Sequence, residues 1–273
     1  MLAGAMILAA APCHAETAVE TPSLSGFNEA ATAAAAVSTS GYIEGGIGHA
    51  HLSDGNSTWN DQYLRGHAQV NDTNGFDGEV SHQSHFGDRG TYVGLGYGHV
   101  FDDRWHGSIN AGTSDGGFFL PRLRLDAFLY HKWLERKSLV TNIGLGYNRA
   151  KDDHFDRSLS FGAAWYFDAP WIAEGGVRLN QSNPGQVTAN RVFAALTWGR
   201  DRHHYLTLRH ETGREAYQLI GPVAVLSDFD SRETSVVWRQ WIATNVGFNL
   251  RVAHYANPSY RRSGLEAGLF LNF

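Results

Sequence analysis

The chain has 273 residues and a formal net charge of -5, and 31 of its residues are glycine, about 11% against an average of about 7%. Charged residues at 18% and aromatic residues at 12% exclude an acidic disordered chain and a coiled coil. The negative balance provides no basic surface on which a nucleic-acid reader could be built, so nucleic acid is not an expected partner.

The first residues form an apolar run, 1–13, that is too short for a membrane-spanning helix of about 20 residues. It is typical of a secretory signal, and a small-x-Ala cleavage site ends at Ala15. We therefore expect residues 1–15 to be a signal peptide. The single cysteine, Cys13, falls inside it, so the exported protein would contain no disulfide.

Residues 16–40 are rich in Ala, Ser and Thr and differ from the rest of the chain. One interpretation is a flexible periplasmic leader, and the other is a peptide that enters and partly plugs a barrel lumen. Both interpretations place the folded domain at residues 41–273.

From Gly41 onward, apolar and polar residues alternate with a period of two. In one stretch Leu123, Leu125 and Leu129 lie on one face, and Arg124 and Asp126 lie on the other. We expect fourteen strands, or twelve if two short strands merge. Their expected ranges are 41–52, 59–70, 75–86, 91–101, 104–113, 121–133, 137–149, 156–167, 170–181, 186–199, 203–213, 231–241, 245–255 and 260–273.

The connections alternate between tight turns such as 102–103 and longer loops such as 114–120 and 214–230. Short periplasmic turns opposite longer outer loops are typical of outer-membrane barrels. We therefore expect an all-β fold, a closed antiparallel up-and-down transmembrane β-barrel, in contact with outer-membrane lipid and lipopolysaccharide of a Gram-negative bacterium. A soluble barrel or sandwich is the alternative. Tryptophans at strand ends favour the membrane because they resemble interfacial girdles: Trp59, Trp105, Trp133, Trp165, Trp171, Trp198 and Trp241.

The last eight residues, 266–273, alternate polar and apolar side chains and end on phenylalanine. This pattern resembles the C-terminal signal by which the barrel assembly machinery recognises its substrates. The resemblance assigns the assembly signal to Gly268, Leu271 and Phe273 and makes that machinery an expected partner.

The C-terminal third also carries short motifs, at 209–213, 216–217 and 234–240, before the closing strand. Together with the order of features, they resemble the YaiO family of outer-membrane proteins, which are small β-barrels with a signal peptide. The resemblance implies a link to surface structures and exopolysaccharide export, with a polysaccharide or a periplasmic export protein as partner. It implies no catalytic residue and no cofactor.

If the apolar faces meet lipid, the opposite faces line a lumen with charges of both signs. Such charges either pair and hold a narrow barrel shut or surround an open conduit, and both interpretations stand. The charged candidates for the lumen lining are Asp61, Arg65, Glu79, Arg122, Arg124, Asp126, Glu174, Arg178, Arg191, Arg209, Glu211, Glu233, Arg239 and Arg251.

Aromatic residues of the same faces could stack on sugar rings, or could simply fill the interior. These candidates are Tyr63, Phe128, Tyr130, Tyr166, Phe193 and Tyr205. The favoured interpretation is thus a non-enzymatic barrel, either a passive conduit or a structural surface protein linked to polysaccharide export.

Two histidine patterns suggest other chemistry. His82 and Ser84 share one strand face, an arrangement similar to that of outer-membrane lipid A deacylases, in which His would activate Ser. No well-placed carboxylate orients His82, so an acyl hydrolase is kept only as the alternative. His49 and His51 have metal-ligand spacing but no third ligand, and no metal is expected.

Overall fold

The computed structural model describes residues 40–221 and 224–273, so the expected signal peptide and almost all of the leader segment lie outside the described residues. The described chain forms fourteen strands. They are β1 (Ser40–Leu52), β2 (Trp59–Gln69), β3 (Asn74–His85), β4 (Asp88–Val100), β5 (Trp105–Gly116), β6 (Leu123–Trp133), β7 (Leu139–Arg149), β8 (Phe155–Tyr166), β9 (Trp171–Asn183), β10 (Val187–Arg200), β11 (His204–Leu219), β12 (Val225–Trp241), β13 (Val246–Ala256) and β14 (Arg261–Asn272).

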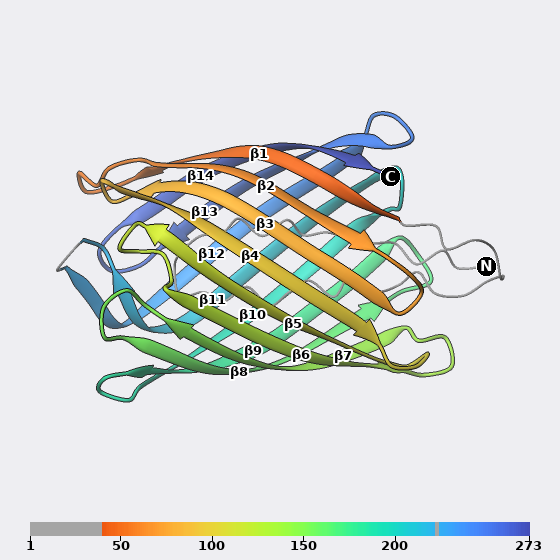
Figure 1. Ribbon diagram of the computed structural model, residues 1–273, viewed down its shortest axis with the longest axis horizontal. Coiled ribbons are helices and arrows are strands. Elements are labelled where there is room, and N and C mark those ends of the chain that lie inside the picture. Colours follow the sequence, from red (N-terminus) through yellow and green to blue (C-terminus); the bar gives the residue numbers. More distant parts are fainter. Residues whose placement is uncertain (1–39, 222–223) are drawn as a thin grey trace.

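Each strand pairs antiparallel with the next, and β1 pairs with β14 to close the barrel (Figure 1). The closing register runs from Tyr42 opposite Asn272 to Leu52 opposite Arg262. The predicted closed up-and-down barrel is confirmed, with fourteen strands rather than twelve. Closure leaves the sheet without an edge, so the backbone N–H and C=O groups of every strand find hydrogen-bond partners in the neighbouring strands. Hydrocarbon could not provide such partners.

Within the described residues there is no helix long and apolar enough to span a bilayer.

The largest difference from the expected elements lies at 214–230. This range was expected to be a loop, but β11 and β12 continue through it as a hairpin, from Arg214 opposite Asp230 to Leu219 opposite Val225. The alternation breaks there because four consecutive residues, 215–218, are all buried. Outside them, Arg214 Nε lies 2.7 Å from Asp228 Oδ1. The hairpin therefore extends beyond the wall made by the other strands.

The outer surface of the wall is apolar. Ile47, Leu95 and Leu269 are 64%, 69% and 66% exposed, as residues that face lipid should be. Exposed tryptophans gather near one end of the barrel, at 40–46% exposure: Trp105, Trp133, Trp165, Trp171, Trp198 and Trp238. The aromatic girdle expected from the sequence is thus present at that end.

Trp59 and Trp241 do not belong to the girdle, contrary to the expectation. They are 1% and 8% exposed because strand register places them on the same faces as Asp61 and Arg239, inside the barrel. Residues near a strand end occur on both faces of the sheet, so closeness to the end does not tell which face a ring occupies. Only the alternation along the strand decides that.

The start of β1 and the end of β14 lie at the girdle end (Figure 1). The opposite end carries the connection 53–58, the connection 117–122 and the β11–β12 hairpin. Outer-membrane barrels have short turns toward the periplasm and longer connections outside. We therefore name the girdle end the periplasmic end and the opposite one the outer end.

Leu95→Arg places a charge near the middle of the lipid-facing wall. We expect it to lower the free energy of unfolding by about 2–4 kcal/mol, the cost of a cation near the bilayer midplane. Urea titration of the protein in phospholipid vesicles measures this. Ile242→Arg is the control, because Ile242 is also well exposed (65%) but lies in a turn outside the wall. Equal effects of the two variants would contradict the placement of Leu95 in lipid.

Candidate functional site

The inward faces of the strands bring charges from distant parts of the sequence together in the lumen. Glu44 on β1 is fully buried, and its carboxylate contacts Arg65 Nη2 at 2.5 Å and Arg239 Nη1 at 3.4 Å. Asn249 and Tyr63 donate further hydrogen bonds to the same carboxylate, at 2.5 and 3.0 Å. Glu44 was not singled out from the sequence, although its inward position in the alternation would have found it.

A second group of ion pairs lies on β10, β11 and β12. Arg191 contacts both Glu211 and Glu215, and Arg209 Nη2 lies 2.9 Å from Glu211 Oε2. On the next strands Glu233 accepts from Arg251 at 2.6 Å and from Arg262 at 2.9 Å. Because both signs are present, these charges neutralise one another within the lumen.

The opposite wall carries a smaller group. Arg124 Nε lies 2.7 Å from Asp126 Oδ2, and Arg178 donates to Ser158 Oγ at 2.7 Å. Glu174 lies on the inward face of β9. Glu79 on β3 stands opposite Arg65 in the strand register.

Arg122 differs from the other lumen candidates. It is exposed and precedes β6, which begins at Leu123. Pro121 stands before it and has no backbone N–H to donate to a ladder, so the strand starts after this pair. Arg122 therefore lies at the rim, where its backbone N–H still donates to Arg149 O on β7 at 2.8 Å, and its place in the lumen lining stays a prediction.

The sugar-stacking candidates all lie on inward faces, but other groups already cover their rings. The Arg65 guanidinium lies 4.4 Å from the centre of the Tyr63 ring, and Arg209 lies 3.8 Å from that of Phe193. Tyr130 stacks on His106 with ring centres 4.5 Å apart. The remaining rings pack in two apolar clusters inside the barrel. Phe128 belongs to one and Tyr205 to the other, and Tyr166 packs against both.

An aromatic group closes part of the outer mouth, and it was not foreseen. The connection 117–122 folds inward, so that Phe119 is only 7% exposed. His85 stacks between Trp59 and Phe119, with ring centres 3.9 and 4.5 Å away, and its Nε2 lies 2.8 Å from Asp61 Oδ1. We call Trp59, His85 and Phe119 the mouth seal.

The sequence did contain a signal for this inward connection. Gly116 and Gly117 have φ of 66° and 58°, a conformation that favours glycine and turns the chain sharply. They precede three apolar residues, 118–120, and such a run in an outer loop indicates burial rather than exposure to water.

The connection between β7 and β8 adds a polar cluster at the same mouth. Tyr217 Oη donates to Asp152 Oδ2 at 2.6 Å, and the His154 ring stacks on Tyr217 with centres 3.6 Å apart. Burial by itself would raise the pKa of Asp152, but the hydrogen bonds from Tyr217 and His154 outweigh it and lower that pKa below its ordinary value. Asp152 is thus ionised at neutral pH.

The His–Ser arrangement considered above is not assembled as a pair. His82 is exposed, and its Nδ1 lies 3.1 Å from Thr91 Oγ1 on the neighbouring strand. His49 bonds Asn60 across strands at 2.8 Å. Among residues 40–221 and 224–273 no group of three or more His, Cys, Asp or Glu side chains could hold a metal ion.

The assembly-signal residues divide between the two surfaces. Leu271 and Phe273 are exposed toward lipid, while Gly268 is buried on the inward face. A Cβ at Gly268 would lie 2.5 Å from Tyr63 Oη and 3.0 Å from Glu44 Oε1. Glycine is therefore required at this position to make room for the Glu44 cluster.

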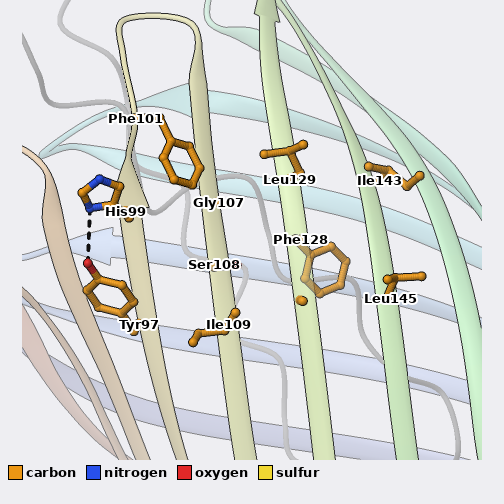
Figure 2. A pocket seen from close by; sticks show the side chains of 11 residues that line it. Tyr97, His99, Phe101, Gly107, Ser108, Ile109, Phe128, Leu129, Ile143 and Leu145 are labelled. Carbon is orange, nitrogen blue, oxygen red and sulfur yellow. Dashed lines mark hydrogen bonds between the residues drawn. The ribbon is translucent and has the colours of Figure 1, made fainter.

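A hollow of about 580 Å³ lies on the lipid-facing surface of β4 to β7 (Figure 2). Gly107 and Ala127 line it with little side-chain volume, and at its edge Tyr97 and His99 hydrogen-bond each other at 3.2 Å. Because its walls belong to the outward face, the hollow is open to lipid and separate from the lumen. Its apolar lining residues include Phe101, Ile109, Leu129, Ile143 and Leu145.

The comparisons with known proteins agree with this architecture. The family model named YaiO membrane beta barrel domain matches residues 41–218. A search of curated proteins finds no match.

Solved outer-membrane barrels share the fold at very low sequence identity. The CymD monoaromatic hydrocarbon channel is 6% identical with a TM-score of 0.53, and covers 86% of this chain and 87% of its own. The anion-selective porin from Comamonas acidovorans is 7% identical with a TM-score of 0.50, and covers 86% and 99%. A loop-deletion mutant of OmpT from Vibrio cholerae is 11% identical with a TM-score of 0.49, and covers 85% and 99%.

Glu44→Ala removes the carboxylate that Arg65 and Arg239 share. We expect the free energy of unfolding to fall by about 3–5 kcal/mol, because buried Arg239 loses its counter-charge and Arg65 keeps only the longer contact with Glu266, at 3.7 Å. Urea unfolding in vesicles measures the change, with Glu135→Ala in an exposed turn as the control. A loss no larger than that of the control would show that the cluster is dispensable for stability.

Proposed function

The chain belongs to the YaiO family of membrane β-barrels, and we propose that its barrel is a non-enzymatic conduit in the outer membrane through which a surface polysaccharide passes. The observation that supports this proposal is the lining of the lumen, where paired charges and aromatic rings occupy the same inward faces. A purely structural role in displaying surface polysaccharide is the weaker form of the same proposal.

A polysaccharide presents hydroxyl groups along its edges and apolar faces on its rings. The ion-pair clusters offer acceptors and charge-assisted donors for the hydroxyls. Tyr63 and Phe193 lie beside these clusters, and a guanidinium covers only one face of each ring, so a sugar would stack on the other face. Since both signs are present, the lining favours no sign of small ion. This combination suits a chain of sugars better than a charged solute.

The mouth seal gives the conduit a closed resting state. Phe119 comes from a connection between strands, whereas Trp59 and His85 belong to the wall. Residues 117–121 can therefore move outward without breaking a backbone bond between paired strands, at the loss of the hydrogen bond from Phe118 N to Asp88 Oδ2. The ionised Asp152, which is exposed, and the Tyr217 ring lie at the same mouth, where a sugar could first bind.

The similar solved structures support the proposal of a channel only because they share the fold. Two proteins with closed barrels of this kind are named as a hydrocarbon channel and an anion-selective porin. The link to polysaccharide rests on the lining residues and on the family resemblance. A periplasmic export protein would meet the tight turns of the periplasmic end, and the barrel assembly machinery would recognise the closing strand.

The double substitution Phe119→Ala, Leu120→Ala removes the inward side chains of the connection, which are 7% and 1% exposed. We expect the single-channel conductance in planar bilayers to rise roughly twofold or more, because a hydrophobic constriction is lost. Phe101→Ala, on the lipid-facing surface, should leave conductance unchanged.

A panel of neutral and acidic oligosaccharides then tests the cargo by transient block of that current. Block that weakens in Phe193→Ala supports passage of a saccharide along the lining. No conductance in any variant, including one that lacks residues 16–40, would leave only the structural role.

The hydrolase alternative is tested by mass spectrometry of lipid A from cells that overexpress the protein. We expect the number of acyl chains to stay the same with the wild type and with Ser84→Ala, because His82 bonds Thr91. Loss of an acyl chain that depends on Ser84 would establish the enzyme instead.

A further inference from the structure

A cluster of basic and hydroxyl side chains lies on the outward surface of β12, β13 and β14, at their outer halves. Arg232 and Arg261 stand on either side of Ala256 in the strand register. In the row two residues closer to the membrane centre, His254 stands between Thr234 and Ser263. All of these side chains except Ala256 are exposed. We call Arg232, Thr234, His254, Arg261 and Ser263 the outer patch.

The two arginines of the patch differ from those of the lumen. Lumen arginines such as Arg65, Arg191 and Arg251 contact carboxylates. Within residues 40–221 and 224–273, by contrast, neither Arg232 nor Arg261 has a carboxylate within ion-pair distance. The outer patch therefore holds two arginines without an ion-pair partner in the described part of the chain, and the nearest carboxylate of the same face on β12, Asp230, lies one row farther out, opposite Arg214.

The geometry of the sheet lets both guanidiniums reach one small anion. Two strand spacings of about 4.8 Å separate the Arg232 and Arg261 backbones, about 10 Å in all. The small side chain of Ala256 leaves the space between them open. Two arginine forks across such a gap match the oxygens of a phosphate, to which arginine binds in a bidentate manner.

The row below supplies further donors. His254 Nδ1 lies 3.0 Å from Ser263 Oγ, and this hydrogen bond fixes the orientation of the ring. It does not involve the other ring nitrogen, Nε2. The Thr234 hydroxyl stands on the other side of His254 and contacts His210 Nδ1 at 2.8 Å. A neutral imidazole and a hydroxyl have one proton each, so the His254–Ser263 pair has one donor left for a phosphate oxygen, either Nε2–H of His254 or the hydroxyl of Ser263. The second row can thus hold the face of the anion that the arginines do not reach.

The level of the patch on the barrel identifies the source of the phosphate. Arg261 begins β14, a strand of 12 residues. At about 3.3 Å per residue and a tilt near 40°, such a strand spans about 30 Å of barrel height, whereas the apolar band is about 25 Å tall. Arg261 therefore lies at the level of the lipid headgroups in the outer leaflet, and the patch faces those headgroups rather than the lumen.

We propose that the outer patch binds a phosphate group of a phosphorylated glycolipid in the outer leaflet. The arginine pair holds the phosphate, and His254 with its hydroxyl neighbours holds the adjoining polar part of the headgroup. This site is independent of the conduit, because the patch and the lumen lie on opposite faces of the same strands.

The experiment uses the full chain in detergent and lipid A that carries two phosphates, with binding measured by native mass spectrometry across a lipid titration. We expect the double variant Arg232→Ala, Arg261→Ala to weaken binding by about tenfold or more. The control is Arg149→Ala, Arg157→Ala, which removes the same charge from exposed positions on β7 and β8. It should change binding by less than about twofold.

Two further binding measurements on the wild-type protein test the role of the phosphate group. The wild-type protein should bind chemically dephosphorylated lipid A about tenfold more weakly than the phosphorylated form, a comparison that needs no variant. Inorganic phosphate at the same concentration should not displace the lipid. The proposal is overturned if both double variants weaken binding equally, if dephosphorylated lipid A binds as well, or if inorganic phosphate competes fully. An unheated gel shift confirms that each variant is folded.

Discussion

A strand inside a bilayer has no water to satisfy its backbone N–H and C=O groups, and this constraint governs the whole molecule. The pairing of β1 with β14 meets it, because it removes the last free edge of the sheet. Once the sheet is closed, each side chain faces either lipid or lumen. The apolar belt, the ion-pair clusters, the mouth seal and the outer patch all follow from that division.

Closure also concentrates charge. Glu44 and Arg239 are 195 residues apart in sequence but lie in contact across the lumen, and Asn249 reaches the same carboxylate from 205 residues away. Charges in such a confined space are stable only as pairs. The pairing explains why Gly268 must lack a side chain, since the Glu44 cluster occupies the space that a Cβ would need.

The same strands carry two different electrostatic surfaces. Glu233 points into the lumen between Arg251 and Arg262, while its neighbour Arg232 points outward with no carboxylate partner among the described residues. A shift of one residue in register would exchange these surfaces. The proposed conduit and the proposed lipid site therefore depend on one structural feature, the parity of each strand.

Much of this was readable from local sequence. The period-two alternation predicted the fold, the number of strands and most of the inward-facing charges, because facing alternates residue by residue in any strand. The predictions failed where alternation carries little information. Trp59 and Trp241 sit at strand ends, and the range 214–230 extends beyond the lipid belt as a hairpin.

The sequence by itself determined that the chain is a membrane barrel and which residues in the middle of the strands face inward, since both depend on neighbours along the chain. Only the tertiary structure decided which inward residues meet, that the connection 117–122 folds into the mouth, and that Arg232 and Arg261 flank one alanine. These outcomes depend on the register between strands and on closure of the barrel. Register joins residues that are far apart in sequence, so no local pattern can reveal it.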